Sequence, residues 1–220
     1  MVAYLIDLVG DQAELPRLAR VGARIAVIFY SSTGNVHRLA TALAEGAAAE
    51  GAEVRLRPVA ELAPPEAIAQ NARWAAHREA TADEPVATVD DLAWADGFAF
   101  GSPTRFGLPA AQLKQFLDQT GGLWARNVLV DKVGTAFTSA STGHGGLEAT
   151  VLAINTVLYH WGSIVLPLGY TDASVKLTGN PYGSSWVSVK GSEPDEAALA
   201  TAHHQGRRLA RVASALRTLR

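Results

Sequence analysis

The segment Ser31-Ser32-Thr33-Gly34-Asn35-Val36 carries the residue types best suited to bind an anion. It follows an apolar run and precedes a stretch with helical periodicity, so it lies where a helix begins. Three hydroxyls, an amide, a turn-forming glycine and the free N–H groups of a helix start form a phosphate cradle. The segment has no Lys or Arg, and neither GxxxxGK[ST] nor GxGxxG occurs in the chain. The pattern favours a single phosphate held by neutral dipoles, with an ordinary N-capped turn as the alternative.

Two further segments have compositions suited to a flat ligand. In Ser102-Pro103-Thr104-Arg105-Phe106-Gly107, a fixed and a free φ bracket backbone that can face the edge of a ring. Residues 139–146, SASTGHGG, combine hydroxyls with glycines that allow close backbone approach. The alternative for residues 102–107 is a surface turn with no ligand, and the alternative for residues 139–146 is a flexible loop at the start of a helix. Because all three segments follow predicted strands, we expect them to converge at one edge of a sheet.

The elements that must position these segments alternate along the chain. Short apolar runs predict buried strands, and apolar residues at helical spacing predict helices between them. The expected strands are 24–30, 52–58, 97–101, 133–138 and 163–167, and the expected helices are 36–49, 88–95, 109–119, 147–160 and 194–216. This order predicts an α/β fold with a doubly wound, five-stranded parallel sheet and helices on both faces. Residues 60–87 and 168–191 fit no regular element and are expected to be functional or flexible insertions.

Composition excludes several classes of function. The chain has 220 residues, no cysteine and a formal net charge of -2. The missing cysteines rule out disulfides, thiolate metal sites and a cysteine nucleophile, and the near-neutral charge argues against nucleic-acid binding. We expect no metal site and no membrane contact, since no segment reaches the roughly 20 apolar residues of a membrane span. A soluble cytoplasmic protein is predicted, with residues 1–23 as a peripheral extension and residues 24–220 as one domain.

Several motifs are together specific. SPTRFG (102–107), FLDQTGGLW (116–124), FTSASTGHGGLE (137–148), LYHWG (158–162) and NPYG (180–183) resemble the WrbA-type NAD(P)H:quinone oxidoreductases. The resemblance runs from about Arg24 to the C-terminus. It implies a flavodoxin-like fold, a bound flavin mononucleotide (FMN), NAD(P)H as electron donor, a quinone as substrate, and a homotetramer of paired dimers.

The resemblance also assigns site residues. The FMN phosphate falls on Ser31 to Val36, and the isoalloxazine ring on two groups of residues and one histidine. These are Pro103, Thr104, Arg105, Phe106 and Gly107; Ser139, Ala140, Ser141, Thr142, Gly143 and His144; and His160. Trp124 is expected to line the substrate pocket, although a Trp beside Gly-Gly could instead anchor a core or an interface. His160 is expected to act beside the flavin, although a lone His on an apolar helix is by default a satisfied core residue.

Three positions depart from the family pattern. Thr33 stands where many members carry a Tyr implicated in NADH contact, Leu108 where others have Asn, and Ala140-Ser141 where Thr-Gly is common. The departures bear on NAD(P)H contact and substrate choice but leave the hydroxyls and backbone donors of the cradle in place.

The implied reaction is ping-pong. NAD(P)H delivers a hydride to the flavin N5 and leaves, and a quinone then takes two electrons in the same slot. The first alternative is a flavodoxin-like electron carrier, which would be expected to be strongly acidic. The second is a non-enzymatic regulatory scaffold, which would not take up FMN.

Overall fold

The computed structural model describes residues 22–217, so residues 1–21 of the predicted extension lie outside the described residues. Its central sheet has the strand order β2-β1-β3-β5-β6. These strands are β2 (Glu53–Pro58), β1 (Arg24–Phe29), β3 (Gly97–Arg105), β5 (Val133–Ala140) and β6 (Ile164–Val165). All four neighbouring pairs are parallel. The predicted five-stranded parallel sheet is confirmed.

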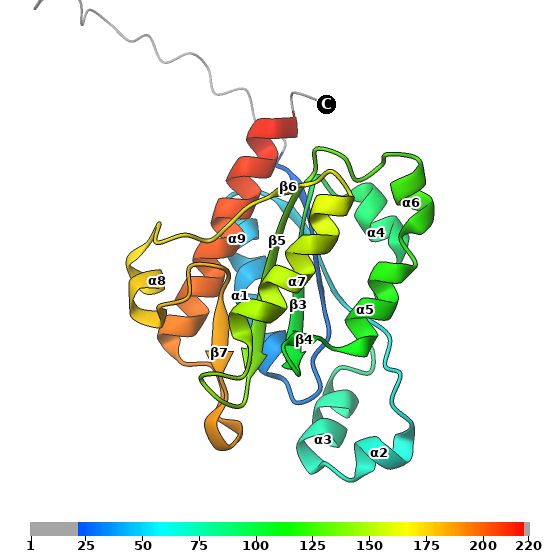
Figure 1. Cartoon of the computed structure of the whole chain (residues 1–220), viewed down its shortest axis with the longest axis vertical. Coiled ribbons are helices and arrows are strands. Elements are labelled where there is room, and N and C mark those ends of the chain that lie inside the picture. Colours follow the sequence, from blue (N-terminus) through cyan, green and yellow to red (C-terminus); the bar gives the residue numbers. More distant parts are fainter. Residues whose placement is uncertain (1–21, 218–220) are drawn as a thin grey trace, which may run out of the picture.

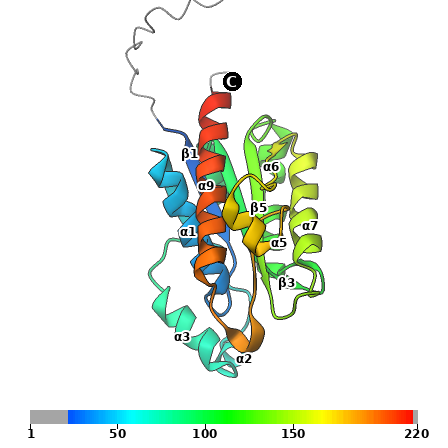
Figure 2. The same ribbon diagram turned by 90° about the vertical axis from the view of Figure 1, so that its left-hand side faces the viewer.

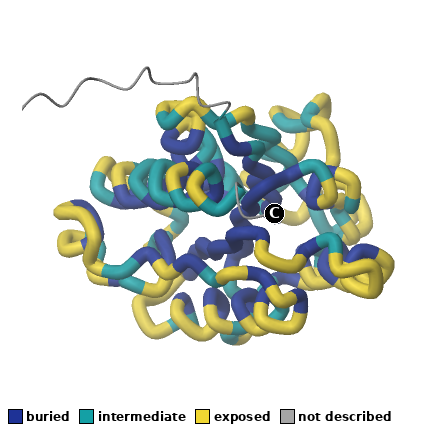
Figure 3. Tube along the Cα trace, turned by 90° about the horizontal axis from the view of Figure 1, so that it is seen from above, coloured by how far each residue is buried: buried dark blue, intermediate teal, exposed yellow. Residues whose placement is uncertain are grey.

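Helices cover both faces of this sheet (Figure 1, Figure 2). On one face lie α1 (Asn35–Ala49) and α9 (Glu196–Leu216). On the other lie α4 (Val89–Trp94), α5 (Ala111–Asp118), α6 (Gly121–Ala125) and α7 (Leu147–His160). Strand β1 shows why, because Val27 and Phe29 pack under α1 while Ala26 and Ile28 pack in the opposite core. Figure 3 shows the buried strands between the two half-exposed helical layers.

Residues 60–87 are more regular than expected. They form α2 (Pro65–Ala69) and α3 (Ala72–Ala80), which lie beyond the carboxyl edge of the sheet (Figure 1). The expectation of no regular element was wrong here. Asn71 caps α3, because its side chain accepts from the N–H groups of Arg73 and Trp74.

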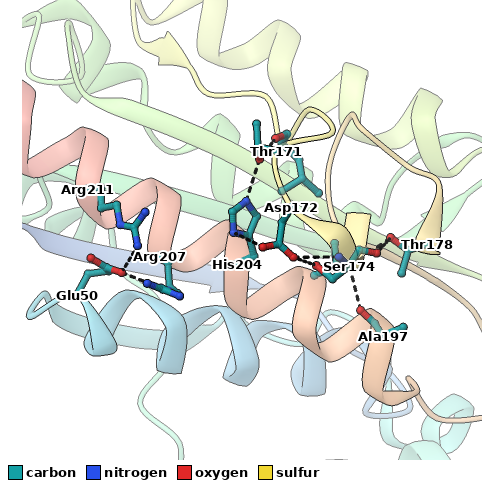
Figure 4. A network of polar contacts seen from close by, with 11 residues as sticks. Glu50, Thr171, Asp172, Ser174, Thr178, Ala197, His204, Arg207 and Arg211 are labelled. Atoms are coloured by element: carbon teal, nitrogen blue, oxygen red, sulfur yellow. Dashed lines mark hydrogen bonds and ion pairs between the residues drawn. The ribbon is translucent and has the colours of Figure 1, made fainter. Parts of the chain in front are cut away.

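Residues 168–191 interrupt the fifth strand. Strand β6 pairs with the start of β5, and β7 (Ser185–Val187) pairs in parallel with its end. Between them the chain leaves the sheet and forms α8 (Ala173–Thr178), which packs on α9. His204 of α9 holds this insertion, since its Nε2 lies 2.8 Å from Thr171 Oγ1 and its Nδ1 lies 3.7 Å from Asp172 Oδ2 (Figure 4).

The gap in the fifth strand is filled by one side chain. Gln205 of α9 donates from Nε2 to the carbonyl of Ala136 in β5 at 2.9 Å and accepts at Oε1 from the N–H of Ser184 at 2.9 Å. Gly183 is required beside it, because a Cβ there would lie 2.1 Å from the Ala136 carbonyl oxygen. The remaining short elements are β4 (Leu108–Pro109), antiparallel to β3, and a single 3-10 turn at Val189–Gly191.

Candidate functional site

Three loops follow β1, β3 and β5, the three central strands, and meet at the carboxyl edge of the sheet (Figure 1). This is where an open parallel sheet binds ligands. Direct contacts join the loops. Arg105 Nη2 lies 3.4 Å from Ser32 Oγ, and Thr104 Oγ1 donates to the Gly145 carbonyl at 3.3 Å. The predicted convergence of the three segments is present in the structure.

The first loop presents backbone donors. Gly34 caps α1 with φ 98°, a conformation that favours glycine, and its N–H donates to Ser31 Oγ at 3.1 Å. The N–H groups of Ser32, Thr33, Asn35 and Val36 donate to no other group within residues 22–217. Unpaired donors at the start of a 15-residue helix, with its positive dipole end, form an anion site.

Asn35 fixes the loop to a distant segment. Its Nδ2 donates to Ser188 Oγ at 2.7 Å and to the Ser192 carbonyl at 3.0 Å. Asn35 is buried, yet its Oδ1 has no hydrogen-bond partner in the described part of the chain. A buried acceptor without a donor is costly, and a bound hydroxyl would satisfy it.

The second loop is a hairpin and not an irregular turn. Strand β3 continues to Arg105, four residues beyond its predicted end, and pairs with β4. Phe106 at the tip has φ 53°, which is uncommon for a bulky residue, and its side chain is fully exposed. Backbone strain of this kind clusters at ligand sites. Ser102 holds the base, since its Oγ accepts from the Ala110 N–H at 2.8 Å.

The third loop is shorter than predicted. Ser139 and Ala140 are buried residues of β5, so the expectation that they belong to the loop was wrong. They remain at the end of a central strand beside Trp186 and Val187 of β7. Ser141, Thr142, Gly143 and His144 form the exposed loop itself.

Trp124 and His160 lie at the other end of the molecule. Helix α7 starts beside the third loop and rises about 20 Å to His160, which precedes the start of β6. Trp124 Nε1 donates to the His160 carbonyl at 3.0 Å, and the two residues line a hollow of about 230 Å³ with α5. Within one chain the structure therefore does not bring these two residues to the loops.

Sequence reasoning missed a group on the insertion that contains α3. The carboxylate of Glu61 accepts from the hydroxyl of Tyr30 at 2.9 Å and from Trp74 Nε1 at 3.1 Å. His77 of α3 lies against Gly34. The sequence holds no signal for this group, because α3 reaches the first loop only through the tertiary fold. Among residues 22–217 we find no cluster of His, Cys, Asp and Glu able to hold a metal ion and no helix long and apolar enough to cross a membrane.

The sequence profile of a family described as NADPH-dependent FMN reductase matches residues 23–174. The chain belongs to this family. Proteins named NAD(P)H dehydrogenase (quinone) are close relatives. One from Deinococcus radiodurans is 44% identical over 186 residues, covering 84% of this chain and 92% of its own. Another from Paracoccus denitrificans is 44% identical over 201 residues, covering 87% and 94%.

Solved structures agree with the family in fold. A flavodoxin described as WrbA-like, from Agrobacterium tumefaciens, superimposes with a TM-score of 0.60 at 25% identity, covering 87% of this chain and 98% of its own. A flavodoxin from the domain Archaea has a TM-score of 0.56 at 18% identity, covering 86% and 98%, and shows the fold alone. The predicted resemblance to the WrbA-type proteins and the flavodoxin-like fold are confirmed.

The family and the fold indicate FMN as the cofactor, and the residues present fit it. The first loop offers unpaired N–H donors for a phosphate, and Asn35 Oδ1 is a buried acceptor without a donor among the described residues. The exposed hairpin tip at Phe106 and the exposed loop 141–144 leave the space beside them open to a flat ring.

Proposed function

We propose that this protein is an FMN-dependent enzyme that reduces quinones by two electrons with NAD(P)H in a ping-pong cycle. Family membership and relatives named NAD(P)H dehydrogenase (quinone) support the overall reaction. The observation that carries the site is the row of N–H donors at the start of α1 that have no partner in the described part of the chain, next to two loops that follow β3 and β5. Bound FMN would supply the two-electron transfer chemistry between NAD(P)H and the quinone.

The chain's own residues bind and orient in this proposal. Ser31 to Val36 hold the phosphate through neutral dipoles. Pro103 to Gly107 present backbone to the ring edge, and the hydrogen bonds of Ser102 and Thr104 fix that backbone. Ser139 to His144 flank the ring from the neighbouring strand. Thr33 and Leu108 lie in the loop and hairpin, so we assign them to contact with NAD(P)H and quinone.

Trp124 and His160 join the site from another copy of the chain. Both are expected beside the flavin, yet they belong to α6 and to the last turn of α7, which lie at the opposite edge of the sheet from the loops of their own chain. Trp124 is half exposed, with 56% of its surface accessible, so a second copy can cover it. In a tetramer of paired dimers, Trp124 and His160 of one copy can cover the three loops of another copy. This arrangement places both residues beside the flavin although they lie far from the loops of their own chain.

An anaerobic spectrum tests the function. The purified, FMN-loaded protein should lose its visible flavin absorbance when NADH or NADPH is added. Adding benzoquinone should restore that absorbance. Steady-state rates should give parallel lines in double-reciprocal plots. A protein that takes up FMN but is not bleached by either nucleotide would be an electron carrier, and one that takes up no FMN would be a scaffold.

The cysteine-free sequence supports a cytoplasmic location as part of this proposal.

A further inference from the structure

The insertion between β2 and α4 places a histidine on the predicted phosphate loop. Helix α3 carries Trp74 and His77 three residues apart, so both face the same side of the helix. A Cβ built on Gly34 would lie 3.6 Å from His77 Nδ1, which is ordinary van der Waals contact. The imidazole therefore lies next to the residue that caps α1, and it lines a small cavity together with Ser31 of the same loop.

Glu61 holds α3 in this position. Its carboxylate accepts five hydrogen bonds, from the side chains of Tyr30, Trp74 and Gln112 and from the N–H groups of Leu62 and Ala63, at 2.7 to 3.1 Å. Tyr30 directly precedes the first loop and Gln112 belongs to α5, so Glu61 links α3 both to the first loop and to α5. These donors hold the pKa of Glu61 below its usual value although burial works against them. The ionised carboxylate of Glu61 therefore holds His77 of α3 next to the first loop.

A second histidine lies behind the first. The ring of His37 in the first turn of α1 stacks on Phe29 with 5.1 Å between centroids, and lies 5.3 Å from the ring of His77. His37 Nε2 is 3.2 Å from a carboxylate oxygen of Glu84. His37 already has an acidic partner, whereas no acidic partner contacts His77 within residues 22–217.

Burial and nearby positive charge disfavour the protonated form of His77. Burial, together with positive charge on His37, Arg38 and Arg78, lowers the pKa of His77 to about 4. Burial also lowers the pKa of His37, opposed by Glu84. The titratable and charged groups that face His77 are His37, Arg38, Arg78, Tyr30, Glu61 and Glu84. Arg38 is engaged by Glu193 at 2.6 Å. A neutral imidazole beside a phosphate site has capacity to take a proton, in addition to the charge of Arg105, whose Nη2 lies 3.4 Å from Ser32 Oγ.

We propose that His77 is a phosphate-binding residue of the FMN site and takes up a proton from solvent when the flavin phosphate binds. An opposite charge within about 4–6 Å raises a histidine pKa by roughly 1–3 units. A phosphate on the first loop would therefore bring His77 into the range where it is partly protonated at pH 6. The ligand chemistry is a phosphate monoester dianion, and the inference rests on the proposed FMN site.

Calorimetric titration with FMN and with riboflavin tests this assignment. Heats are measured at pH 6 in two buffers of different ionisation enthalpy, for the wild type, His77→Gln and His203→Gln. His203 lies on α9 and serves as the matched histidine control. We expect His77→Gln to bind FMN about tenfold more weakly, as one pKa unit of lost interaction implies. We also expect it to take up fewer protons than the wild type. Riboflavin affinity should stay within about twofold, because it lacks the phosphate.

The outcomes separate the two proposals. A wild type that binds neither flavin contradicts the proposed function. If the wild type binds FMN and His77→Gln matches it in affinity and in proton uptake, the role of His77 is wrong while the function stands. An equal loss for FMN and riboflavin also overturns it, since the effect would then be structural. Circular dichroism checks folding, and His77→Asn replaces His77→Gln if that variant does not fold.

Discussion

Gly34 joins the backbone geometry of the phosphate loop to its chemistry. Its φ of 98° turns the chain so that the next N–H groups emerge unpaired at the start of α1. A side chain at such an angle is strained by about 1–2 kcal/mol. The loop itself contains no Lys or Arg, so the direction of these dipoles contributes to its affinity for phosphate alongside Arg105, which reaches Ser32 from the neighbouring hairpin.

Gly34→Ala should therefore weaken FMN binding. We expect about a tenfold rise in the dissociation constant, measured by quenching of flavin fluorescence, because strain of this size reorients the donors. Gly51→Ala is the matched control, since Gly51 also has a positive φ, 80°, but follows α1 at the far end of that helix. An equal loss of affinity in both variants would contradict the assignment of the phosphate to this loop.

The residues of the first loop were predictable and His77 was not, for a physical reason. A hydroxyl-rich turn between an apolar run and an amphipathic stretch is a local pattern, and Ser31 to Val36 show it. His77 reaches Gly34 only because Glu61 draws α3 onto the end of β1. Contacts between segments more than 40 residues apart leave no periodicity to detect.

At the scale of elements, Gln205 repairs the interrupted fifth strand. Gln205→Leu keeps the volume but leaves the Ala136 carbonyl and the Ser184 N–H without partners among the described residues. Each buried group left unpaired costs about 1–3 kcal/mol, so for two groups we expect a loss of roughly 2–6 kcal/mol in unfolding free energy. Urea unfolding followed by circular dichroism measures it. Gln115→Leu on the exposed face of α5 should change stability little. Equal losses of unfolding free energy in the two variants would contradict the role of Gln205 in bridging the interrupted strand.

Helices α1 and α9 are joined by a carboxylate with two guanidinium partners. Glu50 Oε1 lies 2.7 Å from both Arg207 Nε and Arg211 Nη2 (Figure 4). These hydrogen bonds lower the pKa of Glu50 from 4.5 to about 2. A depressed folded pKa means that the contribution is present above pH 4.5 and is lost as the pH falls towards 2.

Glu50→Gln should remove this pH-dependent increment. Between pH 4.5 and 2 the wild type should lose more stability than the variant, because only the wild type has this carboxylate to protonate. Thermal unfolding across this pH range detects the difference. Glu45→Gln, on an exposed position of the same helix, should follow the wild type. A wild-type slope in Glu50→Gln would show that the two arginines do not act through Glu50.

The regular elements were predictable and the insertions were not. Strands β1, β2, β3 and β5 are long apolar or alternating runs, and their ends are predicted within four residues. Strand β6 lies inside the predicted strand 163–167, whereas β7 was not predicted, because its three residues are too few for any period. Their pairing depends on β5 and on Gln205, which lie elsewhere in the chain.

At the scale of the molecule, the distance between Trp124 and the loops makes assembly part of the proposed activity. Trp124→Ala should lower kcat/KM for benzoquinone about three- to tenfold, the range that aromatic contacts of 0.5–1.5 kcal/mol imply. Gly34→Asp should bind no FMN, because it adds a negative charge to the phosphate loop.

Co-expression of these two variants tests whether Trp124 acts between copies. In a mixed oligomer, an intact Trp124 from the Gly34→Asp chain can cover the flavin of the Trp124→Ala chain. We expect kcat/KM per bound flavin to rise towards the wild-type value, by stopped-flow or steady-state assay. If activity per flavin equals that of Trp124→Ala alone, Trp124 does not act between copies.

The interrupted fifth strand also bears on how this fold can vary in evolution. The chain leaves β5 after β6 and returns to the same edge of β5 at β7. Because exit and return share one edge, the intervening length can change without altering the strand order. The fixed requirements are a glycine where Gly183 meets Ala136 and an amide at Gln205. Diversity in related chains should therefore accumulate between Leu168 and Gly179, while the two ends of the excursion stay constant.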